Sequence, residues 1–379
     1  MSEVKNIHVC LVTISLGTGG AQRVVAAQTH MFSALGFRVT TAVLRDPIDY
    51  EYSGELLHLG GKIPSTISST LTPSPANESN KSATKTWQRL WRLYRFIKQN
   101  RPDVIVDHRA RTNIVKEWVY RKLIYRKTRV IYVCHSAHAP IYLTNAPSLF
   151  SKITARSSVH VGVSSYITEQ LMPKYGINNG QYLPNFISPG WLKNSARSTP
   201  IKHPYLLWYG RLDESVKNVG LLFKAFAQST VKTKGYQLII LGSGPDAELL
   251  KDMARSLGIE SSVVFMPFDP NPQAIITGAK CVCLTSYFEG FPMALLESLS
   301  LGTPVVSLDI VSGPSELIQD YINGLLVRER NSLNFAQAID TLCLDPTLYK
   351  KVRAEAHSSV SAYSAQHLSL KWNTLIEHE

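Results

Sequence analysis

The chain has 379 residues, 44% of them hydrophobic and 18% charged, which suits two globular domains of ordinary size. Its formal net charge is +12, and a surplus of eleven comes from residues 85–129, which hold fourteen Lys and Arg against three acids. No apolar run approaches the roughly 20 residues of a membrane-spanning helix, and the first residues lack a secretory pattern, so we expect a cytoplasmic protein.

Strand-like runs alternate with helical patterns through the first half of the chain, which favours parallel α/β layers. Helices are expected over 21–35 and 86–99. Residues 64–84 are rich in Ser, Thr, Pro and Asn and are expected to form an exposed loop. The strands expected in this half are 7–14, 39–44, 103–107, 129–134 and 158–163.

The regular pattern dissolves around residues 184–204, and we place a domain boundary there. The predicted domains are 1–190 and 191–358, and a helical tail over 359–379 is expected to cross back to the N-terminal domain. Two such domains direct the carboxyl ends of their strands toward a shared cleft, where ligands of these sheets bind. The strands expected in the second half are 205–209, 236–241, 263–266, 279–284 and, as the last one, 304–308.

A glycine pair, Gly19 and Gly20, stands between the first strand and the first helix. Glycines let a ligand approach the backbone, and the N–H groups at a helix start favour a phosphate. A tight strand-to-helix turn would explain the same two residues, so this motif alone leaves both interpretations open.

Two cations, Arg211 and Lys217, bracket a loop at the end of the first strand of the second domain. A pair of cations there would neutralise a diphosphate and stabilise it as a leaving group. Two solvated surface cations are the alternative interpretation, and the strand-end position favours a function.

Glu289 and Glu297 stand eight residues apart, across a Gly-Phe-Pro turn and the first turns of the helix that it begins. Pro292 suits the first position of that helix. Both carboxylates could face the cleft and accept hydrogen bonds from the hydroxyls of a sugar or a ribose.

In order and spacing, these segments resemble the family-4 retaining glycosyltransferases of the GT-B architecture over nearly the whole chain. The resemblance implies an α/β fold of two Rossmann-like doubly wound domains that face each other across a cleft. It also implies that the N-terminal domain binds the acceptor and the C-terminal domain binds the nucleotide sugar. The motifs that carry the resemblance are Gly19-Gly20, Gly210-Arg211-Leu212 with Lys217-Asn218, Leu241-Gly242-Ser243-Gly244-Pro245, Ser286 to Glu297, Gly302-Thr303-Pro304-Val305-Val306 and Asn323-Gly324-Leu325-Leu326-Val327.

The activity implied by this resemblance is transfer of a hexose or N-acetylhexosamine from a nucleotide-diphosphate sugar, UDP-linked, to a glycan acceptor. Within the family, Gly313-Pro314-Ser315-Glu316 and the Gly-Phe-Pro turn resemble enzymes that build bacterial polysaccharides, including lipopolysaccharide, or lipid-linked oligosaccharides. The acceptor is therefore expected to be a glycan carried on a lipid.

Specific roles follow from the resemblance, residue by residue. Arg211 and Lys217 match the pair that binds the diphosphate, Glu289 matches the glutamate that holds the transferred sugar, and Glu297 matches the one that binds the ribose. The resemblance thus implies that the cations and Glu289 act directly in catalysis.

Further positions are assigned in the same way. His135 resembles the histidine near the anomeric carbon, although a polar residue capping a strand is the alternative, and His138 and His108 are weaker candidates. The remaining positions expected to contact the donor are Gly19, Gly20, Gly242, Gly244, Phe268, Gly290 and Phe291.

No two aspartates stand two residues apart, so the metal-binding Asp-x-Asp motif of the other main transferase architecture is absent. We therefore expect no metal and no cofactor, with Arg211, Lys217 and the helix termini neutralising the diphosphate instead. No dedicated nucleophile stands out, which favours attack on the same face that the diphosphate leaves. Stereochemical retention is implied by the family resemblance alone.

The basic stretch admits two interpretations. In one, Trp87, Leu90, Trp91 and Tyr94 form a stripe of the helix 86–99 that packs under the sheet, with the arginines in water. In the other, the basic region 85–129 contacts an anionic membrane, on the inner face of the cell membrane, or the phosphate of a lipid-linked acceptor.

Two other function classes compete with a transferase. One is a hydrolase or epimerase that acts on sugar nucleotides, and the cation pair with two spaced glutamates argues against it. The other is a polyanion-binding protein without enzymatic activity. No nucleic-acid motif is present, so we expect no nucleic-acid partner.

Overall fold

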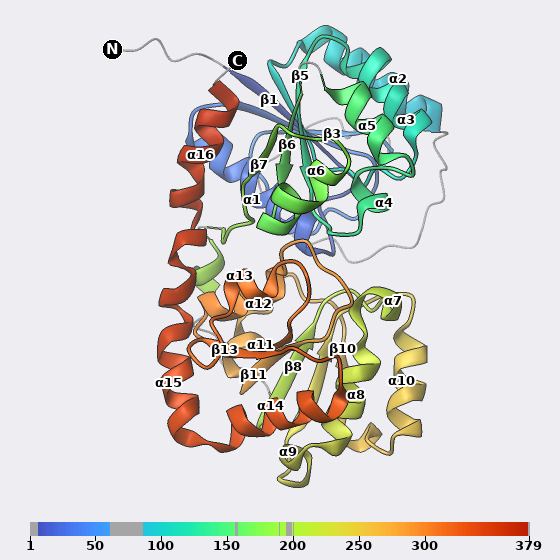
Figure 1. Ribbon diagram of the computed structural model, residues 1–379. Helices are drawn as coiled ribbons and strands as arrows, with labels where there is room; N and C mark the ends of the chain where they lie inside the picture. Colours follow the sequence, from blue (N-terminus) through green and yellow to red (C-terminus); the bar gives the residue numbers. More distant parts are fainter. Residues whose placement is uncertain are drawn as a thin grey trace.

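The computed structural model describes residues 7–60, 86–155, 158–188, 190–194, 199 and 201–377. They form two α/β domains, one above the other in Figure 1, and the last two helices run along one side of both. The loop expected over 64–84 lies outside the described residues.

The N-terminal domain is built on a parallel sheet of seven strands in the order β3-β2-β1-β4-β5-β6-β7. The interior strand β1 is buried along its whole length, as expected for a strand covered on both faces. The edge strands β3 and β7 are short and partly exposed, so they lack the apolar run that identifies the others in the sequence. The strands are β1 (His8–Thr13), β2 (Arg38–Val43), β3 (Glu55–His58), β4 (Val104–Asp107), β5 (Arg129–Cys134), β6 (Ser158–Gly162) and β7 (Gly180–Tyr182).

Helices flank this sheet, and the first of them follows directly on the strand–glycine turn. The π-helical segment Tyr120–Tyr125 continues α3 and packs on α2. The helices are α1 (Gly20–Ala34), α2 (Thr86–Asn100), α3 (Ile114–Val119), α4 (Ala139–Tyr142), α5 (Pro147–Thr154) and α6 (Met172–Lys174).

The C-terminal domain holds a second parallel sheet, in the order β10-β9-β8-β11-β12-β13. The expectation that 304–308 is the last strand is wrong, because Gly324–Val327 adds a further strand, β13, beside β12. The strands are β8 (Tyr205–Tyr209), β9 (Gln237–Leu241), β10 (Val263–Met266), β11 (Cys281–Leu284), β12 (Val305–Leu308) and β13 (Gly324–Val327).

The helices of this domain include α12, which follows the Gly-Phe-Pro turn, and α14, which packs on α8. Their bounds are α7 (Glu214–Lys217), α8 (Val219–Gln228), α9 (Thr230–Thr233), α10 (Ala247–Ser256), α11 (Gln273–Gly278), α12 (Met293–Ser300), α13 (Pro314–Leu317), α14 (Ser332–Leu344) and α15 (Pro346–Ala356).

The final helix, α16 (Ala365–Glu377), lies against the N-terminal domain. Trp372 packs its ring against Phe32 of α1, with ring centroids 5.6 Å apart. Arg129, at the start of β5, donates to the carbonyl oxygens of Leu375 and Ile376 at 2.7 and 3.0 Å. The first strand and the last helix of the described residues therefore lie on the same domain.

The two domains also meet directly where β5 ends. The backbone N–H of Ala137 donates to the carbonyl oxygen of Glu289 at 3.1 Å. A Cβ on Gly290 would lie 2.5 Å from the carbonyl carbon of His135 and 2.9 Å from the nitrogen of Ser136. Only a glycine leaves room for this approach, which brings the ends of β5 and β11 together.

Part of the basic stretch lies inside the N-terminal domain rather than on its surface. Arg109 forms ion pairs with Asp107 at 2.6 Å and Glu117 at 3.0 Å, and all three are buried. Arg111 is also buried and donates to the carbonyl oxygen of Val133 at 2.8 Å, and Arg121 is 7% exposed. The expectation of one cationic surface over 85–129 is wrong for these three arginines, because they neutralise or cap groups of the core.

The expected packing of helix α2 is wrong for its tryptophans. Trp87 is 61% exposed and Trp91 is 53% exposed, whereas Leu93 and Ile97 are buried. The helix is turned so that its core-facing side centres on positions 93 and 97. The aromatic stripe proposed from the sequence therefore lies half in solvent.

Candidate functional site

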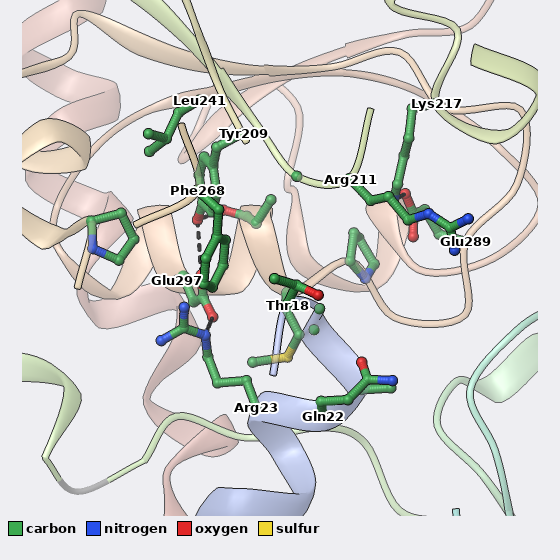
Figure 2. A pocket seen from close by; sticks show the side chains of 18 of the residues that line it. Thr18, Gln22, Arg23, Tyr209, Arg211, Lys217, Leu241, Phe268, Glu289 and Glu297 are labelled. Atoms are coloured by element: carbon green, nitrogen blue, oxygen red, sulfur yellow. Dashed lines mark hydrogen bonds and ion pairs between the residues drawn. The ribbon is translucent and has the colours of Figure 1, made fainter. Parts of the chain in front are cut away.

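A cleft of about 550 Å³ opens between the two domains, where the strands of both sheets end. Its walls come from the turn after β1, the end of β5, and the loops after β8, β9, β10 and β11. Figure 2 shows side chains from both domains pointing into this space.

The N-terminus of α1 forms one wall. Gly19 has a φ of +153°, which side-chain-bearing residues rarely adopt, and Gly20 begins the helix. No side chain caps this end and its first turn holds no acidic residue, so the helix dipole faces the cleft unneutralised. A Cβ on Gly20 would lie 3.0 Å from Cγ of Met293 in the other domain, so the turn also keeps the domains close.

On the opposite wall, Lys217 ends the short helix α7. Its Nζ lies 2.6 Å from Oε1 of Glu289, and the hydroxyl of Ser286 donates to the same oxygen at 2.7 Å. Asn218 adopts a left-handed conformation that separates α7 from α8 and turns Lys217 toward the cleft. The side chain of Arg211 is 64% exposed and lies 3.5 Å from Asp213. The site thus places a cation and a carboxylate side by side, with a second cation near the entrance.

Glu297 lies on α12 in the interior of the cleft and is 2% exposed. The hydroxyl of Tyr209 donates to its Oε2 at 3.1 Å, and Nε of Arg23 lies 3.1 Å from its Oε1 (Figure 2). Burial raises the pKa of the Glu297 carboxyl, and the Arg23 guanidinium opposes that rise.

Arg23 received no role from the sequence, although it stands three residues after the glycine pair. One signal was available: a cation in the first turn of a helix is unfavourable beside the helix dipole, so an arginine there needs a partner elsewhere. That partner is Glu297 of the other domain.

His135 lines the cleft and pairs with a second histidine behind it. Nε2 of His135 lies 2.9 Å from Nδ1 of His108, which is buried. Burial and the nearby guanidinium of Arg111 lower the pKa of His108 to about 3. Burial, His108 and Arg111 also lower the pKa of His135, so both imidazoles are neutral at pH 7.

The other expected donor contacts divide into two groups. Gly244, Phe268 and Phe291 line the cleft, whereas Gly242 and Gly290 do not. A Cβ on Gly242 would collide with the carbonyl oxygen of Gly210, so this glycine allows two loops to touch. Gly242 and Gly290 both serve close backbone packing, and their expected contact with the donor stays a prediction.

His138 is exposed and outside the cleft, with its ring stacked on Phe288 at 5.0 Å between centroids. Among the described residues, no group of three or more His, Cys, Asp or Glu is arranged to hold a metal ion. None of the described helices is both long and apolar enough to cross a membrane. The cleft offers cations, a helix N-terminus and carboxylates, which suit a phosphate ester that carries sugar hydroxyls.

Family comparisons agree with this chemistry. Residues 18–190 match Glycosyltransferase Family 4, and residues 193–359 match Glycosyl transferases group 1. A Campylobacter jejuni protein, N-acetylgalactosamine-N,N'-diacetylbacillosaminyl-diphospho-undecaprenol 4-alpha-N-acetylgalactosaminyltransferase, is 29% identical over 362 residues, covering 92% of this chain and 93% of that protein. A lipopolysaccharide 1,6-galactosyltransferase of Salmonella typhimurium is 37% identical over 174 residues, covering 44% of this chain and 47% of that enzyme.

Solved structures show the same fold. TarM of S. aureus, solved with fondaparinux, alpha-GlcNAc-glycerol and UDP, has a TM-score of 0.77 at 12% identity and covers 98% of this chain and 99% of its own. HepE of Anabaena, solved with UDP-glucose, has a TM-score of 0.73 at 15% identity, with 97% and 99% covered. The expected α/β architecture and family resemblance are confirmed. The chain belongs to the glycosyltransferases of the GT-B fold, with an N-terminal domain of family 4 and a C-terminal domain of group 1.

Proposed function

We propose that this glycosyltransferase moves a hexose or N-acetylhexosamine from a UDP-sugar to a lipid-linked glycan, with retention of configuration and without a metal ion. The observation that carries the proposal is one cleft that unites the α1 N-terminus, the Lys217–Glu289 pair and the buried Glu297. A nucleotide diphosphate sugar presents the complementary groups: a ribose, two phosphates and a polyhydroxylated ring.

The donor's charge is matched by protein groups. The diphosphate lies between the N–H groups of α1 at Gly20 and the cations Arg211 and Lys217, which stabilise the charge that grows as the bond to the sugar breaks. Glu289 then accepts hydrogen bonds from the sugar, and Glu297 from the ribose. These groups take the place of a divalent cation.

Retention is supported by the weakness of the available base. His135 lines the cleft, but its pKa lies well below 6.5. Its imidazole is therefore a weak base for removing the proton of the attacking glycan hydroxyl. The departing diphosphate is then the better base, and it leaves from the face that the acceptor enters. Attack on that same face keeps the anomeric configuration.

The acceptor and its location are proposed from relatives and from the surface. The Campylobacter relative is named for a diphospho-undecaprenol substrate, and the Salmonella relative for lipopolysaccharide. On the N-terminal domain, Trp87, Trp91 and Trp118 are 61%, 53% and 47% exposed. Exposed tryptophans beside Arg95 and Lys98 suit the headgroup region of an anionic membrane, so we place the enzyme on the cytoplasmic face.

A thermal-shift panel of UDP, GDP, ADP and their sugars tests the donor site. One nucleotide should raise the melting temperature of the wild type, and Arg211→Ala/Lys217→Ala should abolish that shift. The matched control is Lys251→Ala/Arg255→Ala, which removes two exposed cations of the same domain. An unchanged shift in the first double variant would refute the assignment of these cations.

The chemical and surface assignments have separate tests. Transfer should survive exhaustive EDTA treatment, and NMR of the product should show the donor's anomeric configuration. Trp87→Ala/Trp91→Ala should weaken binding to vesicles containing phosphatidylglycerol, whereas Leu333→Ala, which removes an exposed leucine of the other domain, should not. Equal vesicle binding by both variants would remove the membrane assignment.

A further inference from the structure

Arg23 belongs to the N-terminal domain, yet its guanidinium contacts the C-terminal domain at two points. Nε lies 3.1 Å from Oε1 of Glu297 on α12. Nη1 donates to the carbonyl oxygen of Pro270, in the loop after β10, at 3.2 Å. The same loop carries Phe268, which lines the cleft. One side chain therefore touches both the buried carboxylate and the loop beside it.

Two aromatic rings hold the guanidinium in this position. The Tyr50 ring centroid lies 4.5 Å from its central carbon, and the Trp191 centroid lies 4.8 Å from it. The side chain of Arg23 is only 17% exposed. A planar guanidinium can stack on rings and donate from its edge at the same time, which a lysine ammonium cannot do. Arginine therefore fits this slot better than lysine, although a lysine there would still supply the positive charge.

Glu297 depends on this neighbour. Its side chain is 3% exposed, and a buried carboxylate without a counter-charge takes up a proton. The charged and titratable groups that face it are Arg23 from α1 and Tyr209 from β8, and Tyr50 faces it across Arg23. Arg23 is the cation among them, so its removal leaves the carboxylate beside two neutral phenols.

Glu297 also retains a buried oxygen that is not used as a hydrogen-bond acceptor. Its Oε2 accepts from Tyr209, while Oε1 receives no well-aligned hydrogen bond and has Arg23 only as an ion-pair partner. A carboxylate oxygen has two lone pairs, so a ribose hydroxyl can donate to Oε1 without displacing Arg23.

We propose that Arg23 is a positioning residue that the N-terminal domain contributes to the ribose site of the C-terminal domain, holding Glu297 as a charged acceptor. The inference rests on the proposed role of Glu297 in binding the ribose. Because the two residues lie on different domains, the ribose site is complete only when the domains are closed. Arg23 itself makes no contact with the reacting atoms.

The sign of the pH effect follows from the burial of Glu297. Without Arg23, only the hydrogen bond from Tyr209 opposes the rise that desolvation causes in the pKa of Glu297, so the carboxyl becomes protonated more readily as the pH falls. A protonated carboxyl accepts a hydroxyl hydrogen bond less well. Burial raises the pKa values of Tyr50 and Tyr209, so both phenols stay neutral between pH 5.5 and 8.5. As the pH is lowered, the variant's affinity for the nucleotide should then fall, and the affinity of the wild type should change little.

The test is isothermal titration of UDP, or of the nucleotide that the wild type binds, at pH 5.5, 7 and 8.5. Arg23→Met should bind UDP about tenfold more weakly at pH 5.5 than at pH 8.5, a change of about 1.4 kcal/mol. Arg23→Lys keeps the charge and should remove most of this pH dependence. The control is Arg38→Met, which breaks an exposed ion pair with Glu55 on the same domain and should behave as wild type.

A nucleotide without ribose hydroxyls separates positioning from a general structural effect. The 2′,3′-dideoxy analogue should bind wild type and Arg23→Met equally, because neither can use Glu297 to hold it. If Arg23→Met does not fold, the single variants Arg23→Lys and Glu297→Gln are compared instead, with UDP and its dideoxy analogue at pH 8.5.

Three outcomes overturn the inference. If Arg23→Met binds UDP as tightly as the wild type at all three pH values, the role of Arg23 is overturned and the proposed function is not. Equal losses for UDP and its dideoxy analogue show that Arg23 only supports the fold of the cleft, which also overturns it. A wild type that binds no nucleotide overturns the proposed function as well, and so distinguishes the two failures.

Discussion

Gly290 provides a direct test of how closely the domains must approach for transfer. A Cβ at this position would lie 2.5 Å from the carbonyl carbon of His135, whereas two carbons in contact need about 3.5 Å. Gly290→Ala must therefore move the backbone of one domain by about 1 Å relative to the other. The neighbouring hydrogen bond from Ala137 to the Glu289 carbonyl oxygen, 3.1 Å long, lies at the same contact.

A displacement of about 1 Å at the reacting groups lowers the rate by about 100-fold, which corresponds to about 2.7 kcal/mol in the barrier. We expect Gly290→Ala to lose transfer to this extent, because Glu289 is the preceding residue and moves with it. The assay is UDP release in the presence of acceptor, after circular dichroism has shown that the variant is folded. Gly190→Ala is the control, since a Cβ there meets nothing within 4 Å. Wild-type kcat in a folded Gly290→Ala variant would refute the argument that this contact sets the geometry.

Three further predictions concern charge. Lys217→Met should lower kcat by about 100- to 1000-fold, as expected for loss of a group that stabilises the leaving diphosphate, and Lys251→Met should leave it unchanged. Arg111→Met should lower the free energy of unfolding by about 3–5 kcal/mol in urea titrations, because Asp107 and four carbonyl groups lose a buried cation. Arg95→Met on the surface should change it by less than about 0.5 kcal/mol. Burial lowers the pKa of His160 to about 4, so the folded protein keeps it neutral while the unfolded chain protonates it below about pH 6.5, and stability is lost as pH falls. His160→Gln should therefore reduce the loss of unfolding free energy between pH 6 and 4.5 by about 1.4 kcal/mol per pH unit, and an identical slope would contradict the neutral assignment.

Helix α2 shows where sequence patterns stop being informative. Leu90, Leu93, Tyr94 and Ile97 satisfy helical periodicity as well as the stripe that includes Trp87 and Trp91. Both stripes are apolar, so the sequence leaves the rotation of the helix open. The packing of Leu93 and Ile97 into the core decides it and leaves the tryptophans in solvent.

Charge counting has a similar limit. The sequence shows a surplus of basic residues in 85–129, but it cannot show that Arg109 and Arg111 lie in the core. Burial there depends on acids and carbonyl groups that the sheet brings together, such as Asp107 at the end of β4. How much of this excess positive charge is exposed to solvent is therefore known only from the structure.

The sequence alone determined the alternation of strands and helices and the residues that end the strands, because both depend on local periodicity and turn chemistry. It thus predicted a two-domain architecture and a site near Gly19, Arg211, Lys217, Glu289 and Glu297. Only the tertiary structure decided which groups meet across the domains: Arg23 with Glu297, and Gly290 with the backbone of His135. Such contacts join residues more than 150 positions apart, and they depend on how two separately folded units approach each other, which no local pattern records.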